Sequence, residues 1–251
     1  MRVISLGSGS KGNATIVEID GKYLLIDNGF TLRETIKRMD LSPKEIRAVF
    51  LTHEHSDHIE GVGALAKAYG LPVHVPVALR NVCEERFIDC EIITHMDTPF
   101  IVDGVTVTPF RVPHDAKYTV GYKFEAKGES FACATDLGEA RVPVLENLKG
   151  VDTVLLESNY DEDMLAGGPY PEALKRRIAS RVGHLSNQES AKVSEFLALN
   201  GTKKIILAHL SENNNAPEIA YYETAKYLEK MVDKDLKIVL GVAEQDKIKI
   251  F

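Results

Sequence analysis

The stretch Thr52-His53-Glu54-His55-Ser56-Asp57-His58 decides how this sequence of 251 residues is interpreted. It packs four potential metal ligands, His53, His55, Asp57 and His58, into six residues. Imidazole and carboxylate groups suit zinc, manganese and iron. His53 and His55 can point the same way if the segment is extended, whereas Asp57 and His58 can aim at a second ion. A lone histidine is usually a surface or core residue without a chemical role, but this grouping predicts a metal site.

Further ligands must come from elsewhere, because four residues rarely complete two metal sites. His114 stands just past a predicted strand, Asp136 at the end of another, and His209 directly after the apolar run 205–208. Strand ends are where open α/β architectures gather functional groups. We therefore expect these three residues to join the cluster, with Asp136 able to bridge two cations.

Short apolar runs bounded by turn residues, together with helical patterns, predict a mixed α/β protein. Strands are expected over 3–6, 14–19, 23–26, 48–51, 91–94, 105–112, 119–126, 130–134, 151–156, 203–208, 237–240 and 247–250. Helices are expected over 31–39 (with Thr31 as N-cap), 61–69, 171–180, 187–199 and 219–231. No repeat or linker interrupts the chain, so we expect a single domain over residues 1–251, with two sheets and helices packed outside.

Composition places the chain among globular proteins. Hydrophobic residues make up 44% and charged residues 27%, which excludes the disordered and fibrous classes. No stretch is long enough to span a bilayer, and no signal peptide is expected. Cys83, Cys90 and Cys133 indicate neither a disulfide frame nor a zinc site, so a reducing cytoplasm is expected. The net charge of −7 counts against a nucleic-acid partner.

In this order the candidate ligands resemble the motifs of the metallo-β-lactamase superfamily, and Leu25-Ile26-Asp27-Asn28-Gly29 looks like its first motif. The resemblance covers nearly the whole chain and implies a hydrolase with an αββα four-layer sandwich. It implies two ligand sets, in which Asp136 is shared. They are His53, His55, His114 and Asp136 for one ion, and Asp57, His58, Asp136 and His209 for the other. Asp27 would support the site without binding metal.

Three more segments are similar to motifs of the β-CASP nucleases. They are the acidic motif at Glu157, the stretch Gly183-His184-Leu185-Ser186-Asn187 and the segment around His209. The large domain that full β-CASP enzymes insert between Glu157 and His184 is missing here. This absence, together with the opening segment 7–13, matches a smaller bacterial group, the WalJ/YycJ type. That resemblance implies 5′→3′ exonuclease action on DNA.

The expected mechanism is phosphodiester hydrolysis with two divalent ions of zinc, manganese or iron. The ions would activate a water molecule and neutralise the transition state. Asp57 or Asp136 would accept the water's proton, and His184 would protonate the leaving alkoxide. Glu157 would orient His184 and keep it protonated. Lactam and thioester hydrolases have less need of such a Glu–His pair, which favours phosphodiesters.

A run of cations before His184 offers a contact for the phosphate backbone. The substrate-binding candidates are Lys175, Arg176, Arg177, Arg181, Ser186 and Asn187, and Arg80 and Arg86 extend the basic track. A solvated helix face is the competing interpretation of the run. The loop 7–12 either presents N–H groups to a phosphate or is a tight turn. His74 and His95 lie outside every motif and are taken as structural.

Three functions stay open at this stage. The first is a DNA exonuclease, with RNA as another possible polymer. The second is a small-molecule phosphodiesterase, thioesterase or lactonase of the same fold. The third is a non-catalytic, metal-stabilised regulatory module. The complete ligand set argues against the third, because a purely structural metal site is usually closed and mononuclear.

Overall fold

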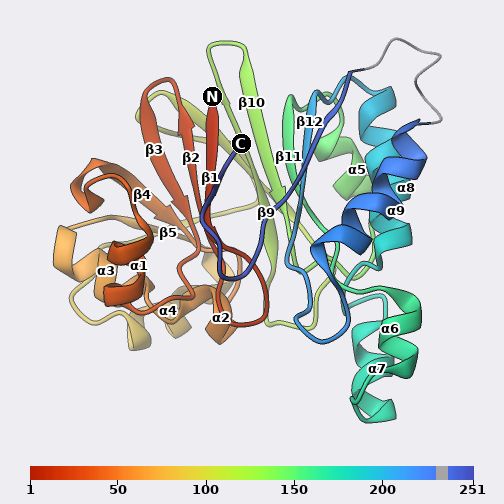
Figure 1. The fold of residues 1–251 in the computed structure, drawn as a ribbon. Helices are drawn as coiled ribbons and strands as arrows, with labels where there is room; N and C mark the ends of the chain where they lie inside the picture. The colour runs from red at the N-terminus through yellow and green to blue at the C-terminus, as the bar shows by residue number, and fades with distance from the viewer. Residues whose placement is uncertain (230–236) are drawn as a thin grey trace.

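Two seven-stranded sheets face each other, and helices cover their outer sides (Figure 1). The structure is a computed structural model that describes residues 1–229 and 237–251. The first sheet runs β14-β1-β2-β3-β4-β5-β6, and the second runs β13-β12-β11-β10-β9-β8-β7. This arrangement confirms the αββα sandwich predicted from the sequence.

The strands of the first sheet are β1 (Arg2–Gly7), β2 (Ala14–Ile19), β3 (Lys22–Ile26), β4 (Ile46–Phe50), β5 (Val73–Pro76), β6 (Ile92–His95) and β14 (Lys249–Ile250). Those of the second are β7 (Phe100–Val102), β8 (Val105–Arg111), β9 (Val120–Ala126), β10 (Glu129–Ala134), β11 (Thr153–Glu157), β12 (Lys204–Ala208) and β13 (Val239–Val242).

The helices are α1 (Leu32–Arg38), α2 (Ser56–Ile59), α3 (Val62–Tyr69), α4 (Arg80–Arg86), α5 (Val142–Leu148), α6 (Glu162–Gly167), α7 (Glu172–Ile178), α8 (Asn187–Leu199) and α9 (Pro217–Glu229). Two 3-10 turns span Pro43–Glu45 and Val77–Leu79. The predicted N-cap is confirmed, because the Thr31 side chain accepts from the Glu34 N–H. The helix predicted over 219–231 is α9, and its last two residues lie outside the described residues.

Three apolar layers hold the sandwich together. The layer between the sheets is built around Phe50, Tyr122, Phe124 and Phe131, each fully buried. Two further layers pack the outer face of each sheet against its helices. Strand β11 is buried along its whole length, as expected of a central parallel strand covered on both faces.

Several short elements were not predicted. They are β5, β7, α2, α4, α5 and α6, each of three to seven residues, too short for a periodic pattern to stand out. Strand β13 lies two residues beyond the predicted 237–240, and β14 is shorter than the predicted 247–250. All of these elements lie outside the predicted ligand motifs except α2, which begins inside the 52–58 stretch.

The parallel strands set the position of the site. Ile26 pairs with Phe50 in the first sheet, and Glu157 pairs with Ala208 in the second. Because parallel strands end together, the residues that follow them meet at one edge of the sandwich. Helices α2, α6 and α7 lie along this lower edge in Figure 1.

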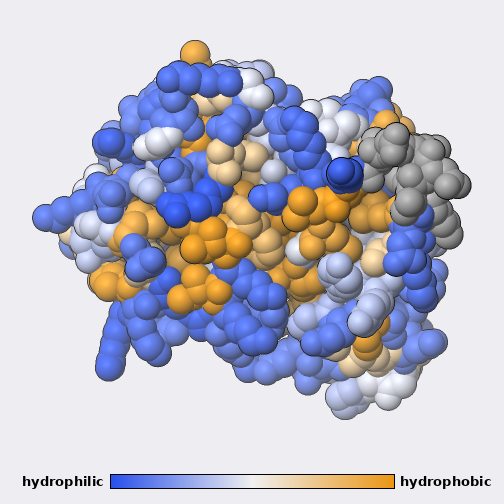
Figure 2. All heavy atoms as spheres, turned by 45° about the horizontal axis from the view of Figure 1, so that its top comes forward, coloured by the Kyte–Doolittle hydropathy of each residue, from blue (hydrophilic) through white to orange (hydrophobic). Residues whose placement is uncertain are grey.

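Apolar side chains also reach the surface and gather on one face (Figure 2). Large apolar side chains that are exposed near the C-terminus include Val239, Ile248 and Ile250, by 58%, 48% and 57%. No helix among the described residues is both long and apolar enough to cross a membrane.

Candidate metal centre

Three residues with unusual backbone conformations stand just beyond the ends of strands from both sheets. Asp27 follows β3, Asp136 lies two residues beyond β10, and His209 follows β12, with φ angles of 55°, 54° and 58°. Left-handed backbone costs a non-glycine residue on the order of 1 kcal/mol or more, and such residues gather at functional sites. In each case the chain turns sharply as it leaves the sheet.

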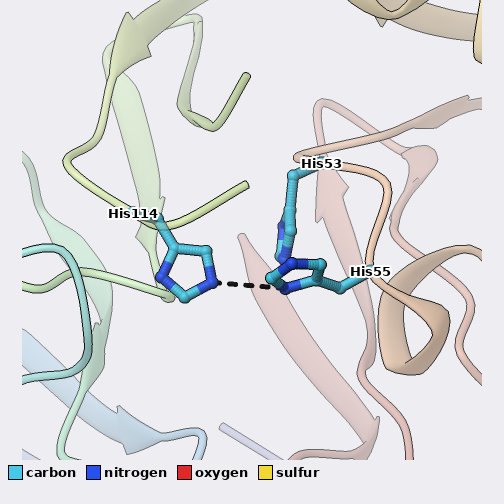
Figure 3. Close-up of side chains that lie close together, drawn as sticks. All are labelled: His53, His55 and His114. Atoms are coloured by element: carbon cyan, nitrogen blue, oxygen red, sulfur yellow. Dashed lines mark hydrogen bonds between the residues drawn. The ribbon is translucent and has the colours of Figure 1, made fainter. Parts of the chain in front are cut away.

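The predicted ligands meet at this edge in four overlapping groups. Within each group, one donor atom from every residue lies within 4.8 Å of the others. The groups are His53, His55 and His114; His53, His58 and Asp136; Asp57, His58 and His209; and Asp136, Glu157, His184 and His209. Figure 3 shows the first group, in which His114 Nε2 lies 3.3 Å from His55 Nδ1. All seven ligands predicted from the sequence are therefore neighbours in space.

Unpartnered buried atoms show that a cation fits between these side chains. His53 Nε2 and His209 Nε2 are buried and have no hydrogen-bond partner. Buried polar atoms are nearly always satisfied, and a divalent ion satisfies imidazole and carboxylate donors together. The donor set thus suits a divalent metal.

Hydrogen bonds on the far side of each ring fix the free nitrogen toward the cluster. His58 Nδ1 donates to Asp27 Oδ2 at 2.7 Å. His53 Nδ1 lies 3.0 Å from Thr52 Oγ1, which itself donates to Asp27 Oδ2 at 2.7 Å. His114 Nδ1 donates to the Gly183 carbonyl at 3.1 Å. This is how proteins commonly hold metal-binding histidines, and it agrees with the supporting role expected of Asp27.

Glu157 joins two histidines from different segments. Its Oε1 accepts from His184 Nδ1 and from His209 Nδ1, both at 2.8 Å, and its Oε2 accepts from the Leu137 N–H. The carboxyl is fully buried, so these three donors hold it in one orientation. The sequence suggested the pair with His184; the second bond to His209 was not foreseen.

Opposite charges within the cluster shift one another's pKa values toward the ionised forms. Burial raises the pKa of Asp136, but the neighbouring His209, His58 and His53 outweigh burial and hold it well below its usual range. Burial lowers the pKa of His209, yet Asp136, Asp57 and Glu157 together raise it to about 10. His53, in contrast, has its pKa lowered by burial and by the adjacent His58. Asp136 is thus held ionised and His53 neutral, which are the forms that bind metal, whereas His209 would release a proton when an ion binds.

A pocket of about 230 Å³ opens onto the cluster. His55, Asp57, His114, Asp136, His184 and His209 line it from the metal side. Ser10, Asn159, Tyr170, Arg177, Ile178 and Ser211 complete the lining. Tyr170 is absent from the sequence-based candidates, because an isolated tyrosine in Gly-Gly-Pro-Tyr-Pro resembles a turn more than a site.

Only one of the predicted substrate-binding cations lines this pocket. Arg177 does so, and it is paired with Asp115. Lys175 of α7 donates to the Ala166 carbonyl of α6 at 2.6 Å. Arg176 and Arg181 are exposed and are not among the pocket residues. Arg80 and Arg86 pair with Glu84 and Glu60.

Ser186 and Asn187 also differ from the expectation that they contact substrate, because both are fully buried. Ser186 is the N-cap of α8 and forms a capping box with Glu189. Asn187 accepts from Ser158 Oγ at 2.7 Å and donates to Asn215 Oδ1 at 2.9 Å. Such a satisfied buried network fixes the loops, so these two residues are structural.

The glycine-rich opening loop is a tight turn in which only Ser10 and Lys11 are exposed. The Gly9 N–H donates to Asn13 Oδ1, and the Lys11 N–H donates to Gln245 Oε1. A Cβ on Gly12 would approach the Phe30 ring to 2.7 Å. Of the two interpretations left open for this loop, these contacts favour the turn, because the N–H groups are occupied within the protein. The Ser8 hydroxyl also accepts from the His209 N–H at 2.9 Å.

Comparison with known proteins agrees with this geometry. The family model described as the beta-lactamase superfamily domain matches residues 22–210. The chain is 36% identical to exodeoxyribonuclease YycJ of Bacillus anthracis, over 90% of this chain and 88% of the relative. It is 35% identical to exodeoxyribonuclease WalJ of Streptococcus pneumoniae, over 97% of this chain and 91% of the relative.

A solved structure gives the same fold. The metallo-β-lactamase fold protein YhfI from Bacillus subtilis superimposes with a TM-score of 0.76 at 15% identity, over 100% of this chain and 98% of that one. With the family match, the ligand order and the two facing sheets in agreement, the chain belongs to the β-lactamase superfamily and is a metal-dependent hydrolase of its metallo-β-lactamase fold.

Proposed function

We propose that this chain is a two-metal phosphodiesterase that degrades DNA from the 5′ end. The observation that carries the proposal is the pair of bonds from buried Glu157 to His184 and His209. A metal cluster alone is compatible with any hydrolase of the fold. A positioned second imidazole beside it supplies the acid that an alkoxide leaving group needs.

The two ion sites that we propose are those implied by the family resemblance, and the grouping of three ligands of each set supports them: His53, His55 and His114, and Asp57, His58 and His209. His53, His55, His114 and Asp136 would hold one ion, and Asp57, His58, Asp136 and His209 the other. When bound, zinc, manganese or iron would supply a hydroxide near neutral pH and neutralise charge on the phosphate. Asp136 belongs to both sets because its two oxygens face different histidines, Oδ1 near His114 at 3.4 Å and Oδ2 near His58 at 3.0 Å.

The protein's own residues then move two protons. Asp57 lines the pocket, and its pKa lies below the usual range because His209 and His58 outweigh the effect of burial. It therefore stands ready as an ionised acceptor for the proton of the attacking water. His184 would give its proton to the leaving oxygen, because Glu157 holds Nδ1 and turns the other nitrogen away from the carboxylate. Arg177 would contact a phosphate at the pocket mouth.

The substrate, the compartment and the direction of degradation are also part of the proposal. The choice of DNA rests on the names of the two exodeoxyribonucleases, each similar over most of its length. We also propose that residues 1–251 act as one domain in a reducing compartment, since Cys83, Cys90 and Cys133 are all free thiols. The 5′→3′ direction is part of the same proposal.

The test is digestion of end-labelled DNA and RNA in the presence of manganese, with wild type beside His184→Ala. We expect stepwise release of a 5′ label from DNA, and a loss of about 10²–10⁴-fold in the variant. Metal content separates an acid from a ligand, because His184→Ala should keep the wild-type metal content. Turnover of a small phosphodiester or a thioester, with both polymers left intact, would contradict the nuclease proposal.

A further inference from the structure

The wall of the pocket opposite the metal cluster comes from a short helical hairpin. Helices α6 and α7, over 162–178, project from the body at the lower edge in Figure 1. Tyr170, Arg177 and Ile178 of this hairpin line the pocket. Helix α7 has no buried residue, so its contribution to the core is small and its inner side faces the pocket.

Tyr170 is held rigidly in that wall. Pro169 fixes its own φ, and Pro171 restricts Tyr170 to extended backbone. The Tyr170 hydroxyl accepts from Asn213 Nδ2 at 2.9 Å, and Asn213 lies in the loop that begins at His209. The ring is only partly exposed. A ring fixed at both its backbone and its hydroxyl loses little conformational freedom when a ligand packs on it.

The chemistry of the wall matches one nucleotide. It offers an aromatic face, an aliphatic side chain and a guanidinium, in Tyr170, Ile178 and Arg177. A base stacks on an aromatic ring regardless of its sequence, and a guanidinium binds phosphate. The volume of about 230 Å³ is below the roughly 300–1,000 Å³ of sites that enclose a whole drug-sized ligand. The pocket therefore accommodates about one nucleotide unit and no length of duplex.

We propose that Tyr170 stacks on the terminal base of the DNA strand and thereby selects a strand end, an inference that rests on the proposed nuclease function. The terminal nucleotide occupies the space between the hairpin and the metal cluster. Its base packs on the Tyr170 ring while the scissile phosphate faces the cluster. A strand whose terminal base stacks on Tyr170 is thus held with its end in the pocket, which favours cleavage of a terminal over an internal phosphodiester.

The test crosses Tyr170→Leu with removal of the terminal base. Two oligonucleotides are compared, one with a normal 5′-terminal nucleotide and one with an abasic tetrahydrofuran unit there. In wild type, loss of the base should lower kcat/KM about tenfold, mainly through KM, as expected for one stacking contact. In Tyr170→Leu the normal substrate should already be about tenfold worse, and removal of the base should cause no further loss.

Two variants serve as controls. Tyr170→Phe keeps the ring and should retain the wild-type preference for the normal end, which separates stacking from the bond to Asn213. Tyr222→Leu changes a tyrosine on α9 that is 66% exposed and does not line the pocket, and it should behave as wild type. A general structural effect of Tyr170→Leu would lower turnover of both substrates and leave their ratio at the wild-type value.

The outcomes separate this inference from the proposed function. If wild type degrades DNA but the two losses multiply to about a hundredfold, Tyr170 does not contact the terminal base and the inference fails alone. If wild type degrades no DNA, the nuclease function fails and the inference falls with it. The stacking role would be established if Tyr170→Leu and removal of the terminal base each lower kcat/KM equally, if the two together cause no greater loss, and if Tyr170→Phe keeps the wild-type preference.

Discussion

The eight histidines of the chain divide into two groups with different surroundings. Six lie in the candidate metal centre, where Asp27, Asp57, Asp136 and Glu157 face them. The other two, His74 and His95, lie among aromatic rings between the sheets. His74 stacks on Phe50 and Phe100 with ring centroids 4.9 and 5.4 Å apart. His95 Nε2 lies 2.9 Å from the Tyr122 hydroxyl.

Burial alone therefore does not identify a ligand, because both groups contain fully or nearly fully buried rings. His53 is 0% exposed and His74 is 5% exposed. What differs is the partner. Carboxylates hold charge in the metal centre, whereas desolvation lowers the pKa of His74 to about 4 and keeps that ring neutral. The following predictions test this contrast, beginning with the largest expected effect.

Asp136→Asn should be the most damaging change in the metal centre. It removes the carboxylate that both proposed ion sites share and puts a neutral amide among buried histidines. Loss of metal-derived charge stabilisation amounts to several kcal/mol, so activity should fall about a thousandfold or more, with less metal bound per chain. Asp40→Asn, at an exposed position, is the matched control. Full metal content and normal turnover in Asp136→Asn would show that the carboxylates do not distinguish the metal centre from the aromatic pair His74 and His95.

Glu157→Gln should impair both functions that its carboxylate connects. The amide keeps the shape but cannot accept from His184 and His209 in the same way, since one end now donates. Removing such a partner of a metal-binding ring typically costs 10–100-fold in metal affinity or activity. Metal titration and turnover should both change, whereas His184→Ala should change turnover alone. Unaltered metal affinity in Glu157→Gln would show that its bond to His209 is dispensable.

Arg177→Ala should weaken DNA binding by a smaller factor. Loss of one phosphate contact should raise KM several-fold and reduce the slope of log affinity against log salt by about one. Arg176→Ala is the matched control, because Arg176 lies next to Arg177 on the same helix but is exposed and does not line the pocket. Identical salt slopes for the two variants would show that Arg177 does not contact phosphate, and would favour the interpretation of the basic run as a solvated helix face.

His74→Phe should have the smallest effect, and only on stability at acid pH. Because the folded-state pKa of His74 is depressed to about 4, the unfolded chain binds a proton that the native state excludes. Wild-type stability therefore falls as pH drops from about 6.5 toward 4, and the variant should lose part of that slope. Denaturant unfolding at pH 7 and pH 5 measures it. Activity at pH 7 should stay at the wild-type level.

The sequence alone predicts the metal-ligand motifs better than it predicts the contacts around them. The seven candidate ligands that meet in the structure could be picked out because four of them lie within six residues and three follow apolar strands. The sandwich was predicted from the same motifs, since periodicity alone indicated only two sheets and outer helices. Tyr170 and the Glu157–His209 bond were missed because they depend on segments 43 and 52 residues apart, respectively, that only the folded chain brings together.

Ser186 and Asn187 illustrate the opposite error. Their place beside His184 in the sequence suggested contact with substrate, but the chain turns there and buries both side chains at the start of α8. Adjacency to a functional residue predicts proximity of the backbone and not the direction of the side chain. Of the six residues predicted to contact substrate, Arg177 alone lines the pocket.

The central claim is that the six-histidine group holds two divalent ions and the aromatic pair holds none. It is tested most directly by titrating metal-stripped protein with zinc and counting ions per chain, for wild type, Asp136→Asn and His74→Phe. We predict two ions in wild type and in His74→Phe, and fewer than two in Asp136→Asn. A single ion in wild type, or an ion lost from His74→Phe, would contradict it.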